Sequence, residues 1–323
     1  MMPNLAKFGT PIYLGQRLFL IALTVLAVSS IVFVGIHELP GSAFVSDRLR
    51  PEQQAILLHQ YGLDRPLWLQ YRDFIGGLIT HGSLGVSVAN RGLQITPLVL
   101  REATVSLEVG GVALLFTIGL GLLFGIFAAL HQNRWADYLL TSISVIGYSV
   151  PNFVVAALLL LLFAVLLFNW TDQSFYYQIG WSGTYGSLGE IWLPAFALGF
   201  PYASYVTRLI RGSMLEVINQ DYIRTARAKG LAERWVVIRH ALRNALIPVV
   251  TVLGPLAIGI LTGSVVVENI FGIPGLGKEF VQSILSHDYN VVIGVFTMYA
   301  GLVGLANLTV DFLYPIIDPR IRL

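Results

Sequence analysis

The sequence predicts an all-α integral membrane protein with six transmembrane helices and both termini in the cytoplasm. Of its 323 residues, 55% are hydrophobic and only 12% are charged, and the mean hydropathy is +0.72, values outside the usual balance of a soluble domain. Because lipid offers the backbone no hydrogen-bond partners, a chain crosses it as helices of about 20 mostly apolar residues. Six stretches meet this requirement, at residues 18–36, 104–130, 139–168, 191–210, 248–267 and 291–314.

The distribution of basic residues predicts the orientation of these helices. With the N-terminus inside, thirteen Lys and Arg residues fall in cytoplasmic segments, whereas the short outer loops contain Lys278 alone, and cytoplasmic loops are the basic ones. Residues 37–102 contain six basic and six acidic residues, but a segment of this length crosses largely regardless of charge. The thirteen are Lys7, Arg17, Arg134, Arg208, Arg211, Arg224, Arg227, Lys229, Arg234, Arg239, Arg243, Arg320 and Arg322.

The first stretch and the outer segment that follows it come next in the chain. Residues 18–36 are long enough to span, and no small-residue cleavage site follows them, so an uncleaved signal anchor is favoured over a signal peptide. Residues 37–102 predict a small ordered cap with a helix over 52–61. Turns are expected at Gly62, Pro66, Gly76, Gly77 and Gly82. Interfacial packing is favoured over a docked partner for Leu67, Trp68, Tyr71 and Phe74.

Small residues and prolines mark the later spans. The pairs Gly121/Gly125 and Gly259/Gly263 predict close helix packing, which small residues permit in a membrane. Prolines can interrupt a helix inside a span, and they occur at Pro151, Pro194, Pro201 and Pro255. The outer segments 169–190 and 268–290 predict loops with turns and a short interfacial helix. One membrane domain is expected to cover residues 1–323.

Motifs for catalysis, nucleotides and metals are rejected. Residues 272–278 resemble the start of a phosphate-binding loop, but Glu279 replaces the required Ser or Thr and Pro274 removes an amide. The six histidines are scattered, and cysteine is absent, so no metal-ligand spacing occurs. The net charge of +2 is too small to indicate nucleic acid. The sequence therefore predicts no catalytic residue, metal site or bound cofactor in this chain.

Carboxylates in or near the spans raise a separate question. Glu108 and Asp311 fall inside predicted spans, and Glu268 falls at a span end. Because a charge in hydrocarbon is costly, such residues often mark ion or proton pathways. For Asp311, a structural anchor paired with a basic residue is favoured over a proton relay.

The segment 212–247 is a charged connection between the fourth and fifth spans. It contains six Lys and Arg residues, which the positive-inside rule alone would explain. Its pattern indicates more, because residues 222–229 are compatible with a helix and Gly230 can provide a turn. Apolar residues then recur at helical spacing, at Trp235, Ile238, Leu242, Ala245 and Val249. The pattern predicts a helix, a glycine turn and an amphipathic helix leading into the fifth span.

These residues resemble the permease subunits of ATP-binding-cassette (ABC) importers, specifically the oligopeptide/dipeptide branch (OppB/DppB type). The resemblance is carried by DYIRTARAKGL at 221–231, followed by RHALRNALIP at 239–248. It extends over most of residues 100–323. The further matching segments are residues 150–155, 207–214, 263–277, 288–289 and 311–322.

The resemblance implies a type I ABC importer permease fold and a transporter for peptides. Its expected partners are a second homologous permease, in a heterodimer rather than a homodimer, two cytoplasmic ATPases that bind ATP and Mg, and an external substrate-binding protein. The expected location is a bacterial inner membrane. The same branch carries nickel, glutathione and oligosaccharides, which stay open as cargo. A proton-coupled secondary carrier using Asp311 and Glu108 is the alternative of another class.

The resemblance also implies which residues contact an ATPase. The general importer loop begins with Glu-Ala-Ala, where this chain has Arg224, Thr225 and Ala226, a departure that is usual in the peptide branch. Glu268 and Asp311 remain candidates for a structural or pathway role. The expected ATPase-coupling residues are Tyr222, Arg224, Thr225, Ala226, Lys229, Gly230 and Leu231.

Overall fold

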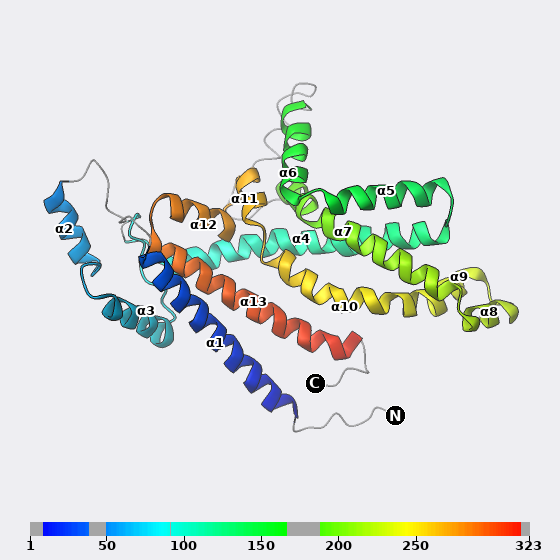
Figure 1. Ribbon diagram of the computed structural model, residues 1–323, viewed down its shortest axis with the longest axis horizontal. Coiled ribbons are helices and arrows are strands. Elements are labelled where there is room, and N and C mark those ends of the chain that lie inside the picture. The colour runs from blue at the N-terminus through cyan, green and yellow to red at the C-terminus, as the bar shows by residue number, and fades with distance from the viewer. Residues whose placement is uncertain (1–8, 39–49, 91, 167–187, 318–323) are drawn as a thin grey trace. The chain divides into compact units, whose positions relative to one another are not determined.

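The computed structural model describes residues 9–38, 50–90, 92–166 and 188–317. Within these ranges there are helices and turns, one isolated bridge between Val86 and Gln94, and no strand (Figure 1). The all-α prediction is therefore confirmed. The helices are α1 (Gly9–His37), α2 (Pro51–Gln60), α3 (Leu67–His81), α4 (Ile95–Leu130), α5 (Trp135–Ser149), α6 (Asn152–Leu160), α7 (Leu188–Ile218), α8 (Asp221–Ala228), α9 (Glu233–Trp235), α10 (Leu242–Leu261), α11 (Val265–Phe271), α12 (Leu276–Leu285) and α13 (Tyr289–Ile317), with π-helical turns at Leu161–Leu166 and Val236–Ala241.

Four helices of the described residues are long and apolar enough to cross a membrane, and a bent helix pair would make a fifth span. Three predicted spans, at residues 18–36, 104–130 and 291–314, lie within α1, α4 and α13. The helix α4 begins earlier than expected, at Ile95, so the last part of the predicted outer segment is already helical. The four helical stretches are Ile12–His37, Ile95–Leu130, Glu233–Leu261 and Tyr289–Phe312.

The predicted span 139–168 is not one straight helix. It contains α5 and α6, which meet at a bend of 104°. Proline at 151 has no amide hydrogen and disfavours helical geometry in the residue before it, and Val150 is extended, with φ −86° and ψ 124°. Residues 167 and 168 lie outside the described residues, as does most of the expected outer segment 169–190.

The predicted span 191–210 lies inside α7, but α7 is not among the helices of the described residues that are long and apolar enough to cross a membrane. Much of α7 is enclosed by other helices of the chain, because α5, α6, α10 and α11 pack against it. Leu193, Ala197 and Leu198 are buried accordingly. A helix that protein surrounds does not need an apolar surface on every side.

The predicted span 248–267 is shifted toward the N-terminus. Its helix runs from Glu233 to Leu261, and Gly263 then adopts a left-handed φ of +78°. Glycine reaches this region without steric cost, so the helix stops there and α11 begins at Val265. Gly259 and Gly263 therefore do not form a helical packing pair, contrary to the sequence prediction.

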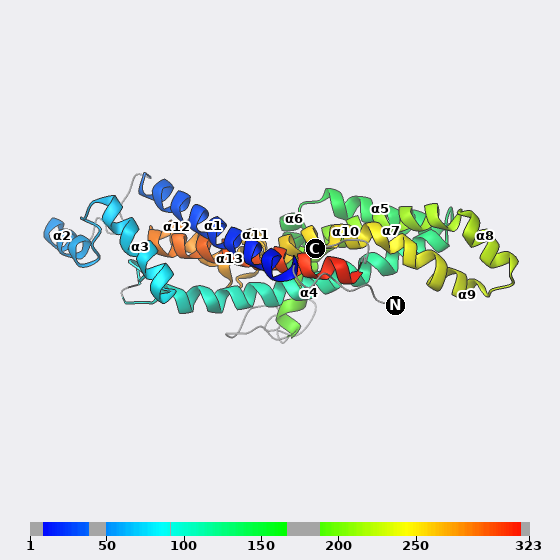
Figure 2. The ribbon, with the colours of Figure 1, turned by 90° about the horizontal axis from the view of Figure 1, so that it is seen from below.

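The chain forms two compact units. Of the described residues, the first unit contains those up to 106 and residues 274–308, and the second contains those from 107 to 273 and residues 309–317. In the first unit α1 runs beside α13 (Figure 2). Phe33 and Ile36 of α1 pack on Val292 and Ile293 of α13.

The outer segment of the first unit has the helix and two of the turns that the sequence predicts. The helix α2 covers the expected 52–61 almost fully, and Gly62 and Gly82 have positive φ values of 67° and 61°. The turn expected at Gly76 and Gly77 is wrong, since both lie inside α3. Glycine weakens a helix by only about 1 kcal/mol, and α3 ends instead at the left-handed Gly82.

The second unit is built around α7. The predicted close approach at Gly121 and Gly125 is confirmed, because α4 meets α7 at these two positions. A Cβ atom on Gly125 would overlap Cγ2 of Ile210 and would lie 2.5 Å from the carbonyl oxygen of Thr207. Only glycine permits this approach of the two helices.

Candidate functional site

The helices α8 and α9 form a knob, residues 221–235, between the end of α7 and the helix that continues as α10. Both views show the knob at the end of the second unit where α7 ends and α10 begins (Figures 1 and 2). The helix and the glycine turn lie where the sequence predicts them. Gly230 has φ +79° and its amide donates 2.9 Å to the carbonyl of Arg227, so the left-handed turn reverses the chain after α8.

The inner face of α8 attaches the knob to the second unit. Ile223 and Ala226, three residues apart, are buried, because residues at this spacing share one face of a helix. They belong to a hydrophobic cluster with Met214 of α7 and with Val237 and Ala245 beyond α9. The knob is therefore packed on the chain itself and is not a loosely attached loop.

Polar contacts join α8 to the following helix at two further points. The side-chain amide of Asn244 donates to the phenol oxygen of Tyr222 at 2.7 Å. Nε and Nη2 of Arg227 donate to the two carboxylate oxygens of Glu233 at 3.1 and 2.7 Å. The hydrogen bond and the charge of Glu233 raise the pKa of Arg227 above its usual value. Each of these contacts joins a residue before the Gly230 turn to a residue after it.

The outer face of α8 and the turn are exposed. Six of the seven expected coupling residues lie there, and Ala226 lies on the buried face instead. The two large apolar side chains among the six, Tyr222 and Leu231, are 42% and 43% exposed. Aromatic residues and arginine, here Tyr222 and Arg224, are enriched on surfaces that bind another protein. The six are Tyr222, Arg224, Thr225, Lys229, Gly230 and Leu231.

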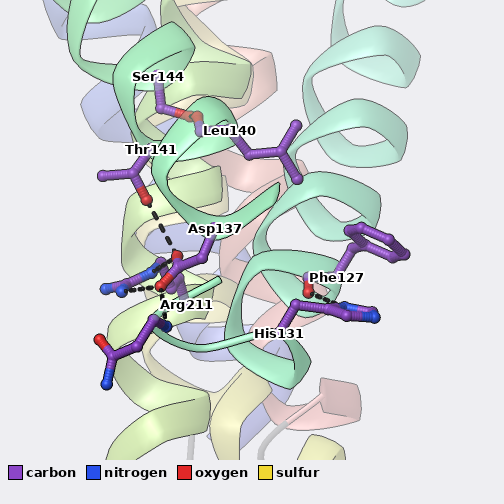
Figure 3. A network of polar contacts seen from close by, with 8 residues as sticks. Phe127, His131, Asp137, Leu140, Thr141, Ser144 and Arg211 are labelled. Atoms are coloured by element: carbon purple, nitrogen blue, oxygen red, sulfur yellow. Dashed lines mark hydrogen bonds and ion pairs between the residues drawn. The ribbon is translucent and has the colours of Figure 1, made fainter. Parts of the chain in front are cut away.

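An ion pair close to this end of α7 was not found by sequence reasoning. Arg211 donates from Nε and Nη2 to the carboxylate of Asp137 in α5, at 2.6 and 2.8 Å (Figure 3). The backbone amide of Asn133 and the hydroxyl of Thr141 also donate to this carboxylate, at 3.0 and 3.3 Å. In the sequence, Arg211 served only to predict orientation, and Asp137 was overlooked. A lone carboxylate at the start of an apolar stretch was the available signal.

The three carboxylates singled out in the sequence lie on different helices. Glu268 is in the first turn of α11 and its side chain is buried. Asp311 is in α13 and is partly buried. Glu108 is in α4, and its Oε2 has no hydrogen-bond partner among the described residues.

The structure of the described residues bears on two kinds of site, a phosphate-binding loop and a metal-ion site. Residues 272–275 join α11 to α12 and residues 276–278 begin α12, so a helix and not the strand that a phosphate-binding loop requires precedes them. Among the described residues, no three His, Asp or Glu side chains come together in a group that could hold a metal ion.

Comparison with known proteins places the chain in a family. Residues 121–323 match the model of the binding-protein-dependent transport system inner membrane component. The chain belongs to this family. It is 39% identical over 311 residues to the dipeptide transport system permease protein DppB of Lactococcus lactis subsp. cremoris, covering 96% of this chain and 99% of the relative.

Further relatives agree on the branch. The dipeptide transport system permease protein DppB of Bacillus subtilis is 40% identical over 312 residues, which cover 96% of this chain and 98% of that protein. The oligopeptide transport system permease protein OppB of Escherichia coli K12 is 39% identical over 300 residues, covering 93% of this chain and 95% of that protein. The resemblance to the oligopeptide/dipeptide branch is thereby confirmed.

A solved structure shares the fold. A chain of the inward-facing MetNI methionine ABC transporter aligns with a TM-score of 0.55 at 19% identity, covering 68% of this chain and 96% of that chain. At this identity the likeness concerns the fold alone. The protein is thus a helical, multi-pass membrane permease of the ABC transporter type.

Proposed function

We propose that this chain is the transmembrane permease subunit of an ATP-driven importer, and that it translocates peptides delivered by an external substrate-binding protein. The cargo is supported by the names of the relatives, which are dipeptide and oligopeptide transport permeases. No residue of the chain catalyses a reaction. ATP and Mg bind to partner ATPase subunits.

Six spans cross a bacterial inner membrane in this proposal. They are formed by α1, α4, the bent pair α5–α6, α7, the helix ending in α10, and α13. The basic residues favour a topology with both termini and the knob in the cytoplasm. The exposed face of the knob then meets the compartment that contains ATP.

The observation that carries the coupling proposal is the two-sided character of α8. Its buried residues Ile223 and Ala226 pack on the chain's own helices, and its exposed residues contact a cleft of one ATPase. Because α8 is packed and hydrogen-bonded to the helix that enters the membrane, a rotation of the ATPase moves that helix as a rigid body. Arg224 and Lys229 pair with acidic residues of the ATPase.

The complex contains two permeases, two ATPases and one binding protein. The second permease is homologous and completes the pathway as a heterodimer. Membrane lipid surrounds both permeases, and nucleic acid is not a partner. The binding protein carries most of the selectivity among peptides.

Two alternatives lead to different measurements. In the first, the same fold carries nickel, glutathione or an oligosaccharide, and the ligand that co-purifies with the binding protein identifies the cargo. In the second, the chain is a proton-coupled carrier that uses Asp311 and Glu108, both of which lie in candidate spans.

Reconstitution in proteoliposomes tests the proposal. With the second permease, both ATPases and the binding protein present, peptide uptake is expected to require ATP and the binding protein, and to persist when an ionophore removes the proton gradient. Uptake by this chain alone that an ionophore abolishes and that is indifferent to ATP would overturn it in favour of the carrier.

A further inference from the structure

Arg208 lies in the segment 207–214, which resembles the peptide branch but which the coupling proposal does not use. Although Arg208 was counted with the cytoplasmic basic residues, it stands on α7 one turn before Arg211, inside the predicted span 191–210. Its guanidinium carbon lies 4.4 Å from the ring centre of Tyr148 in the last turn of α5. The ring of Tyr205 lies 5.8 Å from that of Tyr148. These three residues form an arginine–tyrosine cluster in the second unit.

The guanidinium of Arg208 points away from the knob. Side chains lean toward the N-terminus of their helix, and the N-terminus of α7 is the end opposite the knob. Tyr148 stands eleven residues beyond Asp137 in α5, which is about 16 Å along the helix at 1.5 Å per residue. The charge therefore lies deeper in the proposed span than the Arg211–Asp137 pair. An arginine whose only partners were lipid phosphates would extend its side chain toward the nearer membrane surface, on the side of the knob.

Among the described residues, the charge of Arg208 is compensated only by the face of the Tyr148 ring. Arginine keeps its charge in proteins, and a charge inside a span is costly unless it is paired or faces water. In the described residues no Asp or Glu forms an ion pair with Arg208, and its buried Nε has no hydrogen-bond partner. Contact with the Tyr148 ring attracts the cation but leaves the N–H edge of the guanidinium unused.

We propose that Arg208 binds the C-terminal carboxylate of the peptide during translocation, with Tyr148 and Tyr205 holding the guanidinium in place. The planar N–H edge of arginine matches a carboxylate with two parallel hydrogen bonds. Every linear peptide carries this carboxylate whatever its sequence, so one residue can serve many cargoes. The inference rests on the proposed function and adds a ligand site to it.

Paired peptides test this site in the complete transporter. Proteoliposomes are given a tripeptide with a free carboxylate or its C-terminal amide, each at a concentration that saturates the binding protein. Arg208→Gln is expected to reduce uptake of the free acid roughly ten-fold, as loss of charge-assisted hydrogen bonds implies, and uptake of the amide less than about two-fold. Arg208→Lys keeps the charge without the fork and is expected to give a smaller loss for the acid.

Arg134→Gln is the matched control, because Arg134 is exposed in the turn before α5, and it is expected to leave both uptakes unchanged. Equal losses for the two peptides in Arg208→Gln would assign Arg208 to a lipid, to a carboxylate of the second permease or to folding, and would overturn the proposal. Failure of both Arg208 variants to accumulate in the membrane would also overturn the proposal. If the wild type transports neither peptide, the proposed function itself fails.

Discussion

Asn244 at the start of α10 donates a hydrogen bond of 2.7 Å to the phenol oxygen of Tyr222 in α8. The two residues are on opposite sides of the Gly230 turn, and the ion pair between Arg227 and Glu233 spans the same turn. With Ile223 buried beneath them, these contacts make the knob and the following helix one body. A partner that moves α8 therefore moves a membrane helix.

Gly230→Ala is expected to destabilise the knob and weaken its binding to the ATPase. At φ +79° a side chain costs roughly 1–2 kcal/mol in the left-handed region. Gly230→Asn is expected to be milder, because asparagine tolerates this conformation better. Co-purification of the ATPase with each variant measures the effect. Gly212→Ala is the control, since Gly212 is helical with open space around it. If the two Ala variants retain the ATPase equally, the turn at Gly230 does not support binding of the ATPase.

Asp137→Asn is expected to lower the stability of the second unit by about 3 kcal/mol, the lower end for a broken buried pair. The carboxylate side chain is 2% exposed and that of Arg211 is 26% exposed, so the arginine loses a partner that water replaces only in part. Unfolding midpoints in detergent measure the loss. Thr141→Val removes only a hydrogen bond of 3.3 Å and is expected to cost less than about 1 kcal/mol. A wild-type midpoint for Asp137→Asn would show that the pair contributes little.

Gly125→Leu is expected to prevent correct packing of α4 on α7, because even a Cβ atom there would overlap the side chain of Ile210. Overpacking by a single methyl group already costs about 1–3 kcal/mol, and leucine adds more. Gly119→Leu in the same helix is the control, since a Cβ atom at Gly119 would have no neighbouring atom within 4 Å. Size-exclusion profiles and yields in detergent compare the two variants. Equal yields would contradict the observed close approach.

Acid is expected to loosen the turn between α2 and α3. Hydrogen bonds from Arg65 and then Arg72 hold the pKa of Asp73 below its usual value of 3.8. The ionised form is thus favoured by folding, and its contribution is present above pH 3.8 and lost as pH falls through the lower folded-state pKa. The protection factor for hydrogen exchange at the start of α3, which corrects for the pH dependence of intrinsic exchange, should fall over this range in the wild type and depend less on pH in Asp73→Asn. An identical pH response in the two proteins would show that the contacts of Asp73 with Arg65 and Arg72 do not stabilise this turn.

Local signals predicted much of the fold and most of the knob. Gly230 and Pro151 act through their own backbone geometry, so the turn and the break in the third span could be located from the sequence. Gly76 and Gly77 misled, because the propensity of glycine is weak against a helix that continues to a better stop at Gly82.

Contacts between distant residues could not be predicted. Asp137 and Arg211 are joined only by the packing of α5 on α7, and a single sequence does not reveal which charges meet. For the same reason Ala226 was expected among the coupling residues as a small residue suited to close packing, whereas folding places it on the face of α8 that is buried against the chain's own helices. Helical spacing shows which residues of a short helix share a face, but the helices packed against it determine which face is buried.

Cysteine cross-linking can show whether the knob contacts the ATPase, because the chain contains no cysteine of its own. Single cysteines at Thr225 and Leu231, both exposed on the knob, are compared with one at Ile79, which is exposed on α3. In the assembled transporter, with cysteines introduced along the cleft of the ATPase, Thr225→Cys and Leu231→Cys are expected to cross-link to the ATPase and Ile79→Cys is not. Cross-links from Ile79→Cys, or none from the two knob positions while the ATPase stays bound, would contradict the assignment of the knob as the coupling site.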